Sequence, residues 1–227
     1  MNIIELKEVW KTYQMGEIEV HALRGLNLNI KKGEFVAIQG PSGSGKSTCM
    51  FLVGCLDLPS NGHVFLDGHD ITRMSESHLA QIRGRKIGFV FQRFNLLPTL
   101  SAIENVQIPM IFQGTSKEKR DRVASKLLTK VGLGERMDHK PGELSGGEMQ
   151  RVAIARSLAN DPEVILADEP TGNLDSKTGK EVMKLLEDLH KKEGRTIVMV
   201  THDKNVAAKA ERQVFLKDGQ IVKGGRK

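Results

Sequence analysis

The sequence predicts an α/β protein with a mainly parallel sheet, an antiparallel β sub-domain at its N-terminus and an inserted helical sub-domain. Short apolar runs without alternation recur along the chain, and segments with helical periodicity separate them. Such runs are typical of strands buried on both faces of a parallel sheet. An alternating pattern precedes the first run, and a long polar stretch with helical spacing lies between the second and the third.

The chain has 227 residues, which is enough for one globular unit with sub-domains. Hydrophobic residues make up 39% of it and charged residues 27%, so the composition excludes a wholly disordered chain. We expect a single domain whose core is formed by residues 1–92 and 160–227. Residues 93–159 are expected to form the helical sub-domain.

The strands follow from the spacing of apolar residues. Leu26, Leu28 and Ile30 alternate with asparagines, which predicts a half-buried antiparallel strand. Asp218-Gly219 between two apolar segments predicts a β-hairpin. The buried parallel strands are expected at 35–38, 87–91, 164–167 and 196–200.

Two helices are marked by candidate N-caps. Ser116 precedes a segment with helical spacing inside the predicted insertion. A second amphipathic pattern begins at Ser176, which we take as its N-cap, and ends near Gly194. Cys49 and Cys55 are expected on different faces of one helix, so a disulfide between them is not predicted.

Charge and hydropathy restrict the partners. The formal net charge is +6, yet aromatic residues are only 4% of the chain and basic residues are scattered, except in the tail 223–227. We therefore expect no nucleic-acid partner, and a solvated surface that can lie against an anionic membrane face. The longest apolar run, 50–56, is far shorter than the roughly 20 residues that cross a bilayer, and the N-terminus does not resemble a secretory signal. These features predict a cytoplasmic chain without a transmembrane segment.

Residues 40–47 fit the phosphate-binding pattern G-x-x-x-x-G-K-[ST] between a predicted buried strand and a helix. Its glycines let backbone N–H groups surround an anion, Lys46 adds a positive charge, and Ser47 is placed to bind Mg²⁺. This pattern specifies the fold further, as a P-loop NTPase (RecA-like) core. The expected nucleotide contacts are Gly40, Ser42, Gly43, Ser44, Gly45, Lys46, Ser47 and Thr48.

Asp168 and Glu169 directly follow the predicted buried strand 164–167. Two carboxylates at a strand end are costly unless a cation meets them, and a magnesium–nucleotide complex would do so. Neighbouring residues of a strand point in opposite directions, so the two have different roles. We assign Asp168 to magnesium, directly or through water, and Glu169 to the attacking water as general base or polarising group.

Residues 144–148 have the sequence Leu-Ser-Gly-Gly-Glu and open a helix. Ser145 and Glu148 form a capping box, but this does not explain Gly146 and Gly147 in a first helical turn, where each costs roughly 1 kcal/mol against alanine. Something is expected to approach this backbone closely. The segment resembles the signature motif of ATP-binding-cassette (ABC) ATPases, and the resemblance covers nearly the whole chain.

The resemblance implies that two chains form a homodimer around two ATP molecules, with the signature of each chain over the γ-phosphate held by the other. It also implies roles for further residues. Tyr13 resembles the aromatic that stacks on adenine, Gln92 the glutamine that contacts magnesium and water, and His202 the switch histidine at the γ-phosphate. Asp175, in Asn-Leu-Asp, resembles the loop that communicates across the dimer.

Glu148 stands where the family signature usually ends in glutamine. Both residues can close a capping box, so we interpret the change as a subfamily trait without loss of activity. The segments 89–98 and 166–175 resemble the cassettes of lipoprotein release (LolD-like) and macrolide export (MacB-like). By that resemblance the dimer drives two integral-membrane permease subunits from the cytoplasmic face of the cell membrane.

Other functions stay open at this point. A cell-division cassette of similar sequence is one alternative, and a DNA-repair, chromosome-organising or translation ATPase is another. The short segment between Ser47 and Ser145 leaves no room for the long coiled coil of chromosome-type members. A small-molecule kinase would share the phosphate loop but would not need the signature segment.

Overall fold

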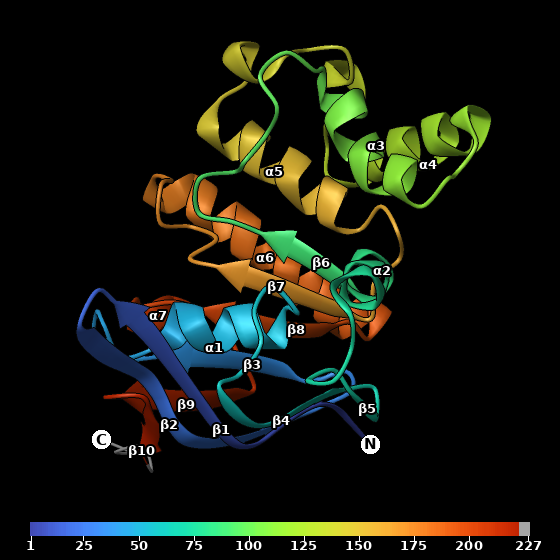
Figure 1. Ribbon diagram of the computed structural model, residues 1–227. Coiled ribbons are helices and arrows are strands. Elements are labelled where there is room, and N and C mark those ends of the chain that lie inside the picture. The colour runs from blue at the N-terminus through green and yellow to red at the C-terminus, as the bar shows by residue number, and fades with distance from the viewer. Residues whose placement is uncertain (223–227) are drawn as a thin grey trace. The chain divides into compact units, whose positions relative to one another are not determined.

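A computed structural model describes residues 1–222 (Figure 1). The basic tail 223–227 lies outside the described residues. The chain divides into two compact units, one formed by Met1–Arg83 together with the segment from Gly194 onward, and one formed by Gly84–Glu193. Helix α2 (Glu76–Lys86) contains the first boundary between them.

The first unit contains an antiparallel sheet of β1 (Asn2–Met15), β2 (Ile18–Lys31), β4 (Asn61–Leu66) and β5 (His69–Asp70), in the order β2-β1-β4-β5. In β2 the predicted alternation is present, because Leu26, Leu28 and Ile30 are buried while the asparagines between them are exposed. The apolar face of the sheet is therefore set by the period-two pattern.

The same unit holds β3 (Phe35–Gln39), β8 (Thr196–Val200), β9 (Arg212–Lys217) and β10 (Gln220–Val222), which lie side by side in the order β10-β9-β3-β8. β3 is parallel to β8 and β9, and all residues of β3 and β8 are buried, as the runs without alternation predict. The predicted hairpin is also present, since β9 and β10 pair across Asp218 and Gly219 with φ of 49° and 77°.

Helix α1 (Lys46–Val53) packs against β2 and β4 of the antiparallel sheet and against β8 of the other strands (Figure 1). It ends earlier than predicted. Gly54 is its C-cap and Cys55 has φ of 53°, so the two cysteines do not share a helix. Both thiols are buried and free, as expected. The short helix α7 (Lys204–Ala207) begins after Asp203, whose side chain caps it.

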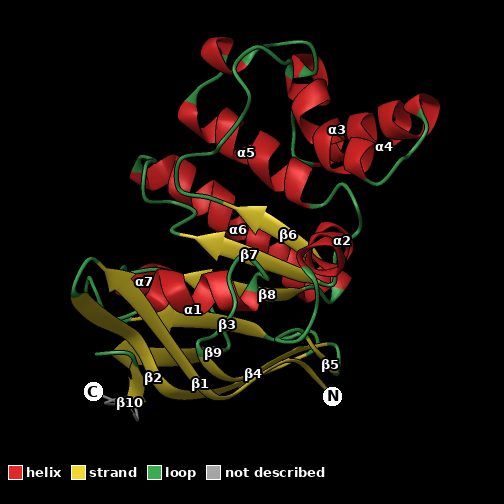
Figure 2. Ribbon diagram, in the orientation of Figure 1, coloured by secondary structure: helices red, strands yellow, loops and turns green. Residues whose placement is uncertain are grey.

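The second unit contains the parallel pair β6 (Ile87–Val90) and β7 (Val164–Asp168) and four helices that begin and end within it (Figure 2). Val106, Leu128 and Val152 are buried in one apolar cluster, which joins the three helices that precede β7 in the chain. The helices are α3 (Ala102–Phe112), α4 (Lys117–Lys130), α5 (Gly146–Ser157) and α6 (Ser176–Glu193), with 3₁₀ turns at Gly134–Arg136 and Pro141–Glu143.

The predicted N-caps have different outcomes. Ser116 does hold the N-cap position of α4, although its side chain makes no capping hydrogen bond there. The assignment of Ser176 as the cap of α6 is wrong. The carboxylate of Asp175 accepts from the backbone N–H groups of Lys177 and Thr178, at 3.0 and 3.1 Å, so it caps this helix. Aspartate is favoured because its negative charge also suits a helix N-terminus.

Candidate functional site

The phosphate-loop pattern lies between the end of β3 and the start of α1, in the strand–loop–helix context that the sequence predicts. Gly45 immediately precedes the helix and has φ of 96°. A Cβ at this position would lie 2.4 Å from the carbonyl oxygen of Ala22. Only glycine fits both the backbone conformation and this close approach.

The first turn of α1 is prepared for an anion. It has no side-chain cap and no acidic residue, so its backbone N–H groups and the positive end of the helix lack a negative partner from these sources. Ser44 Oγ is buried and has no hydrogen-bond partner within residues 1–222. A buried hydroxyl of this kind is costly, and a phosphate oxygen is a chemically suitable partner for it.

Lys46 carries the charge of the loop. Its Nζ donates to the carbonyl oxygens of Gly40 at 2.9 Å and Pro41 at 2.7 Å. The ammonium group is thereby held by the loop itself, and the neighbouring Ser42 and Ser47 are exposed. The loop therefore combines a fixed positive charge, free donors and exposed hydroxyls, which is the donor set that a triphosphate requires.

Two further predicted site residues belong to this unit. Tyr13 lies on β1, half-buried, and its hydroxyl donates to Asp57 Oδ2 at 2.9 Å. His202 is exposed and follows β8 at the carboxyl end of that strand. Because β3 and β8 are parallel, the phosphate loop and His202 both follow carboxyl ends at the same edge of these strands.

The remaining predicted site residues lie in the second unit, either near the carboxyl ends of β6 and β7 or, for the signature segment, at the start of α5. These strands are parallel and pair Val90 with Ala167, so Gln92 and Asp168 both emerge at one edge. Glu169, directly after β7, has φ of 43°, a left-handed backbone conformation that costs a non-glycine residue about 1–3 kcal/mol. Its carbonyl oxygen accepts from the Gly172 N–H at 2.9 Å.

Gln92 is tied to the loop that follows Glu169. The Asn173 side chain donates to the Gln92 carbonyl oxygen at 2.8 Å, and a Cβ on Gly172 would lie 2.8 Å from Gln92 Nε2. Gln92 and the segment leading to Asp175 therefore form one packed cluster within this unit. Asn173 contacts Gln92 because β6 and β7 pair with each other. No local sequence pattern indicates that pairing.

The signature segment forms the predicted capping box. Ser145 Oγ accepts from the Glu148 N–H at 3.3 Å, and Glu148 Oε2 accepts from the Ser145 N–H at 2.8 Å. Hydrogen bonds from the backbone and then the hydroxyl of Ser145 lower the pKa of Glu148 below its ordinary value. Glutamate thus performs the capping role expected of the residue at this position.

The two signature glycines differ in their surroundings. A Cβ on Gly147 would lie 2.2 Å from Thr178 Cγ2, so the chain itself requires glycine there. A Cβ on Gly146 would meet only Leu174 at 3.5 Å and Phe94 at 3.8 Å, which are ordinary contacts. The expected close approach is therefore made within the chain at Gly147, whereas no contact among residues 1–222 requires glycine at position 146.

Residues 1–222 contain no group of three or more His, Cys, Asp or Glu side chains arranged to hold a metal ion. The predicted magnesium ligands Ser47, Gln92 and Asp168 each offer an oxygen atom, the kind of ligand atom that Mg²⁺ prefers.

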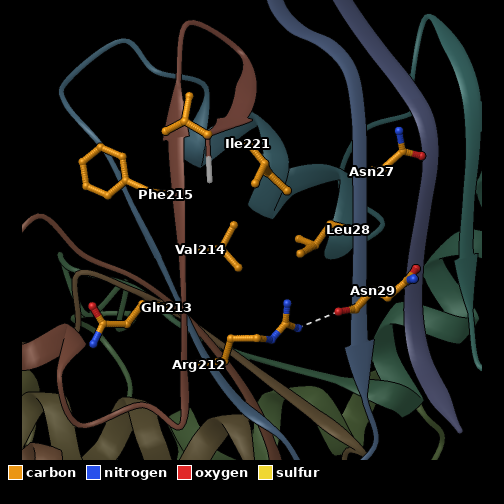
Figure 3. A pocket seen from close by; sticks show the side chains of 9 residues that line it. Asn27, Leu28, Asn29, Arg212, Gln213, Val214, Phe215 and Ile221 are labelled. Atoms are coloured by element: carbon orange, nitrogen blue, oxygen red, sulfur yellow. Dashed lines mark hydrogen bonds between the residues drawn. The ribbon is translucent and has the colours of Figure 1, made fainter. Parts of the chain in front are cut away.

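A cavity of about 340 Å³ lies in the first unit, lined by residues of β2, β9 and β10 (Figure 3). Leu28, Val214 and Ile221 point into it, and none of the predicted site residues lines it. Arg212 at its edge donates to the Asn29 carbonyl oxygen at 2.6 Å and pairs with Glu34. The charge of Arg212 is therefore compensated by the protein, and the cavity is separate from the chemistry described above.

The buried strand, glycine loop and lysine, together with the carboxylates after a parallel strand, define an ATPase of the P-loop class. A family model described as "ABC transporter" matches residues 23–172. The chain belongs to the ABC transporter family, as the ATP-binding and ATP-hydrolysing cassette. The predicted fold class, family and ATPase activity are thereby confirmed.

Relatives agree with this membership. An ABC transporter ATP-binding protein of Thermotoga maritima is 53% identical over 96% of this chain and 93% of its own length. The macrolide export ATP-binding/permease protein MacB of Hyphomonas neptunium is 53% identical over 97% of this chain. The match covers 34% of MacB, so this chain spans about a third of that protein.

A solved structure of the ATP-binding cassette MJ0796, dimeric and bound to ADP and Pi in a post-hydrolysis state, matches with a TM-score of 0.89. It is 52% identical and the match covers 96% of each chain. MJ0796 itself comes from Methanocaldococcus jannaschii. None of the helices in residues 1–222 combines the length and hydropathy needed to cross a membrane.

Proposed function

We propose that this chain is the ATPase subunit of a transporter complex, which dimerises around two ATP molecules and drives two integral-membrane permease subunits. The observation that best supports the proposed dimer concerns Gly146. It occupies the first turn of α5 at a cost in helix stability, and its own chain leaves room for a side chain there. A glycine without an internal reason is best explained by an external group, here the γ-phosphate bound to a second copy.

The phosphate loop then binds the triphosphate of ATP. Backbone N–H groups of Gly40, Gly43 and Gly45 surround the phosphates, with Ser42, Ser44 and Thr48 as further contacts. Lys46 exchanges its two loop carbonyls for phosphate oxygens and stabilises negative charge there.

Tyr13 stacks on the adenine base. Ser145, Gly146 and Gly147 of the second copy close over the γ-phosphate.

Hydrolysis is assigned to residues at the strand ends. Glu169 accepts a proton from the attacking water or polarises it, while Gln92 orients that water and His202 donates to the γ-phosphate. Ser47, Gln92 and Asp168 would hold Mg²⁺, which when bound neutralises charge on the phosphates. Asp175 communicates between the two copies. Its role as the cap of α6 fixes where its backbone lies.

The transport pathway is proposed from relatives. MacB is named as an ATP-binding and permease protein, and this chain matches about a third of its length. We propose macrolide or peptide export, lipoprotein release, or related mechanical work, with the chain on the cytoplasmic face of the cell membrane. Cell-division, DNA-repair and translation cassettes are not favoured by the comparisons. Isolation of this chain with its integral-membrane partner, followed by identification of that partner, tests the pathway.

Complementation tests the shared site. Lys46→Ala removes the phosphate-loop charge, and Gly146→Arg blocks the signature face. Each variant alone should be nearly inactive. An equal mixture should recover about a quarter of wild-type activity, because half of the dimers contain one site built from two intact halves. Recovery of no activity in a mixture that still dimerises would contradict the proposal.

Protein concentration supplies a second test. Specific ATPase activity of the wild type should rise with concentration until the dimer is saturated, since each site needs two chains. A kinase-like monomer would have a specific activity that does not depend on concentration. Analytical ultracentrifugation with and without ATP should place the rise in activity at the concentration at which the dimer forms.

A further inference from the structure

Tyr13 is the only tyrosine of the chain, and its ring is held by several groups. Its hydroxyl donates to Asp57 Oδ2 at 2.9 Å. Asp57 lies in the loop between α1 and β4, 44 residues further along the chain. The hydroxyl is therefore fixed to a segment outside its own strand.

Lys11 holds the second carboxylate oxygen of Asp57. Its Nζ lies 2.6 Å from Asp57 Oδ1 and donates to the Leu58 carbonyl oxygen at 2.8 Å. Its side chain is 13% exposed, so this ion pair is largely shielded from water. Lys11 and Tyr13 are two residues apart on one strand and share a face, which puts Nζ 4.9 Å from the centroid of the Tyr13 ring.

These contacts limit the freedom of the ring. An unrestrained surface tyrosine loses side-chain entropy when a ligand stacks on it, and that loss weakens binding. Here the hydroxyl is anchored at its tip and the Lys11 ammonium lies over one face. A base therefore has to stack on the opposite face, and it meets a ring that is already oriented.

We propose that Asp57 and Lys11 are positioning residues, which fix the ring of Tyr13 as a pre-oriented platform for the adenine base of ATP. This inference rests on the proposed adenine-stacking role of Tyr13. It adds two residues to the nucleotide site that no motif indicates, and it assigns them an effect on ATP affinity separate from the chemistry of the phosphates.

The protonation states suit this arrangement. Burial, followed by the hydrogen bond to Asp57, raises the pKa of Tyr13 above its ordinary value, so the phenol remains a donor. Burial alone would raise the pKa of Asp57, but hydrogen bonds from Lys11, Tyr13 and the Leu58 N–H outweigh it and lower that pKa. At neutral pH a charged acceptor thus faces a neutral donor, which is a strong pairing.

The test is Asp57→Asn, which keeps the size of the side chain and removes its charge. We expect the KM for ATP to rise about three- to tenfold and kcat to stay within about twofold, because charge-assisted hydrogen bonds to the ring are weakened. The inhibition constant for inorganic tripolyphosphate should not change, since that ion has no base to stack. Absorbance titration of the single tyrosine should give a lower phenolate midpoint than the wild type.

Two comparisons complete the design. Asp70→Asn is the matched control, because Asp70 belongs to the same antiparallel sheet and bonds His63 and Thr72 instead. It should leave both constants unchanged. Tyr13→Phe should raise the KM for ATP about as much as Asp57→Asn, and combining the two should add little, since both act through one hydroxyl.

Two outcomes would overturn the inference. One is a KM for ATP in Asp57→Asn equal to that of the wild type. The other is an equal rise for ATP and tripolyphosphate, which would indicate damage to the phosphate loop. Failure of the proposed adenine-stacking role is distinguishable, because Tyr13→Ala, which removes the ring itself, would then also leave the KM for ATP unchanged.

Discussion

The side-chain amide of Gln150 donates a 2.7 Å hydrogen bond to the backbone carbonyl oxygen of Pro170, and Gln150 is fully buried. Pro170 directly follows Glu169, whose φ of 43° requires support from its surroundings. This hydrogen bond links the early part of α5, which carries the signature glycines, to the backbone beside the proposed base. We therefore expect Gln150 to couple the signature helix to the backbone at Glu169.

Replacement of Gln150 by Met removes this link while keeping a similar volume. We expect kcat to fall at least about tenfold with little change in the KM for ATP. The protein should also lose about 1–3 kcal/mol of stability, because a buried carbonyl loses its partner. Gln107→Met is the control, since Gln107 is also buried but donates to Asp121. Steady-state kinetics and urea unfolding measure both effects, and an unchanged kcat in Gln150→Met would refute the link.

Gly146→Ala should separate stability from activity. The added methyl group meets only ordinary contacts within the chain, and alanine favours a helix over glycine by up to about 1 kcal/mol. We expect unfolding to occur at equal or higher urea concentration, while ATPase activity falls because in the proposed dimer the methyl group would face the nucleotide of the second copy. Full activity in this variant would argue against a close approach at Gly146.

Gly147→Ala should lower stability, because the contact that excludes a side chain at this position lies within the chain. Its methyl group would overlap Thr178 Cγ2, and Thr178 cannot move freely because its hydroxyl is bonded to Asp175. We expect a loss of about 1–3 kcal/mol in stability. Thr178→Ser removes the overlapping methyl group and keeps the hydroxyl, so the double variant should regain much of the loss. A double-mutant cycle by urea unfolding measures this coupling, and strict additivity would contradict it.

Glu148→Gln tests the departure from the usual signature. The pKa of Glu148 in the folded state is below the ordinary glutamate value of 4.5, so the charged form contributes stability above about pH 4.5. That contribution is lost as the pH falls through the lower, folded-state pKa. Glutamine still closes the capping box, so ATPase activity should be retained. The fall in stability below about pH 4.5 should become shallower in Glu148→Gln than in the wild type. Glu135→Gln, in the nearby 3₁₀ turn, is the control at an exposed glutamate.

Glu169→Gln tests the assignment of the base. Glutamine keeps the shape of the side chain but cannot accept the proton from water, so ATP should bind while turnover nearly stops. ATP-bound dimer should accumulate and be visible by size-exclusion chromatography at saturating ATP. Hydrolysis at the wild-type rate would remove Glu169 from its proposed role.

Much of the fold was accessible from local patterns. The alternation around Leu28, the buried run at 35–38 and the hairpin at Asp218-Gly219 each depend on neighbours a few residues apart. Errors occurred where two local signals compete. Ser176 and Asp175 are both good helix caps, and α1 ends where Cys55 adopts φ of 53°, a conformation that its residue type does not indicate.

The class of chemistry follows from the amino-acid order alone, because the glycine loop with its lysine and the carboxylate pair are each short local motifs whose spacing indicates their function. The distant residues that support these motifs become visible only when the chain is folded. Gln150 meets Pro170, Gly147 meets Thr178, and Tyr13 meets Asp57 through packing between elements remote in the chain. Periodicity states which face of an element is buried, but the register of strands and the packing of helices decide what lies against that face.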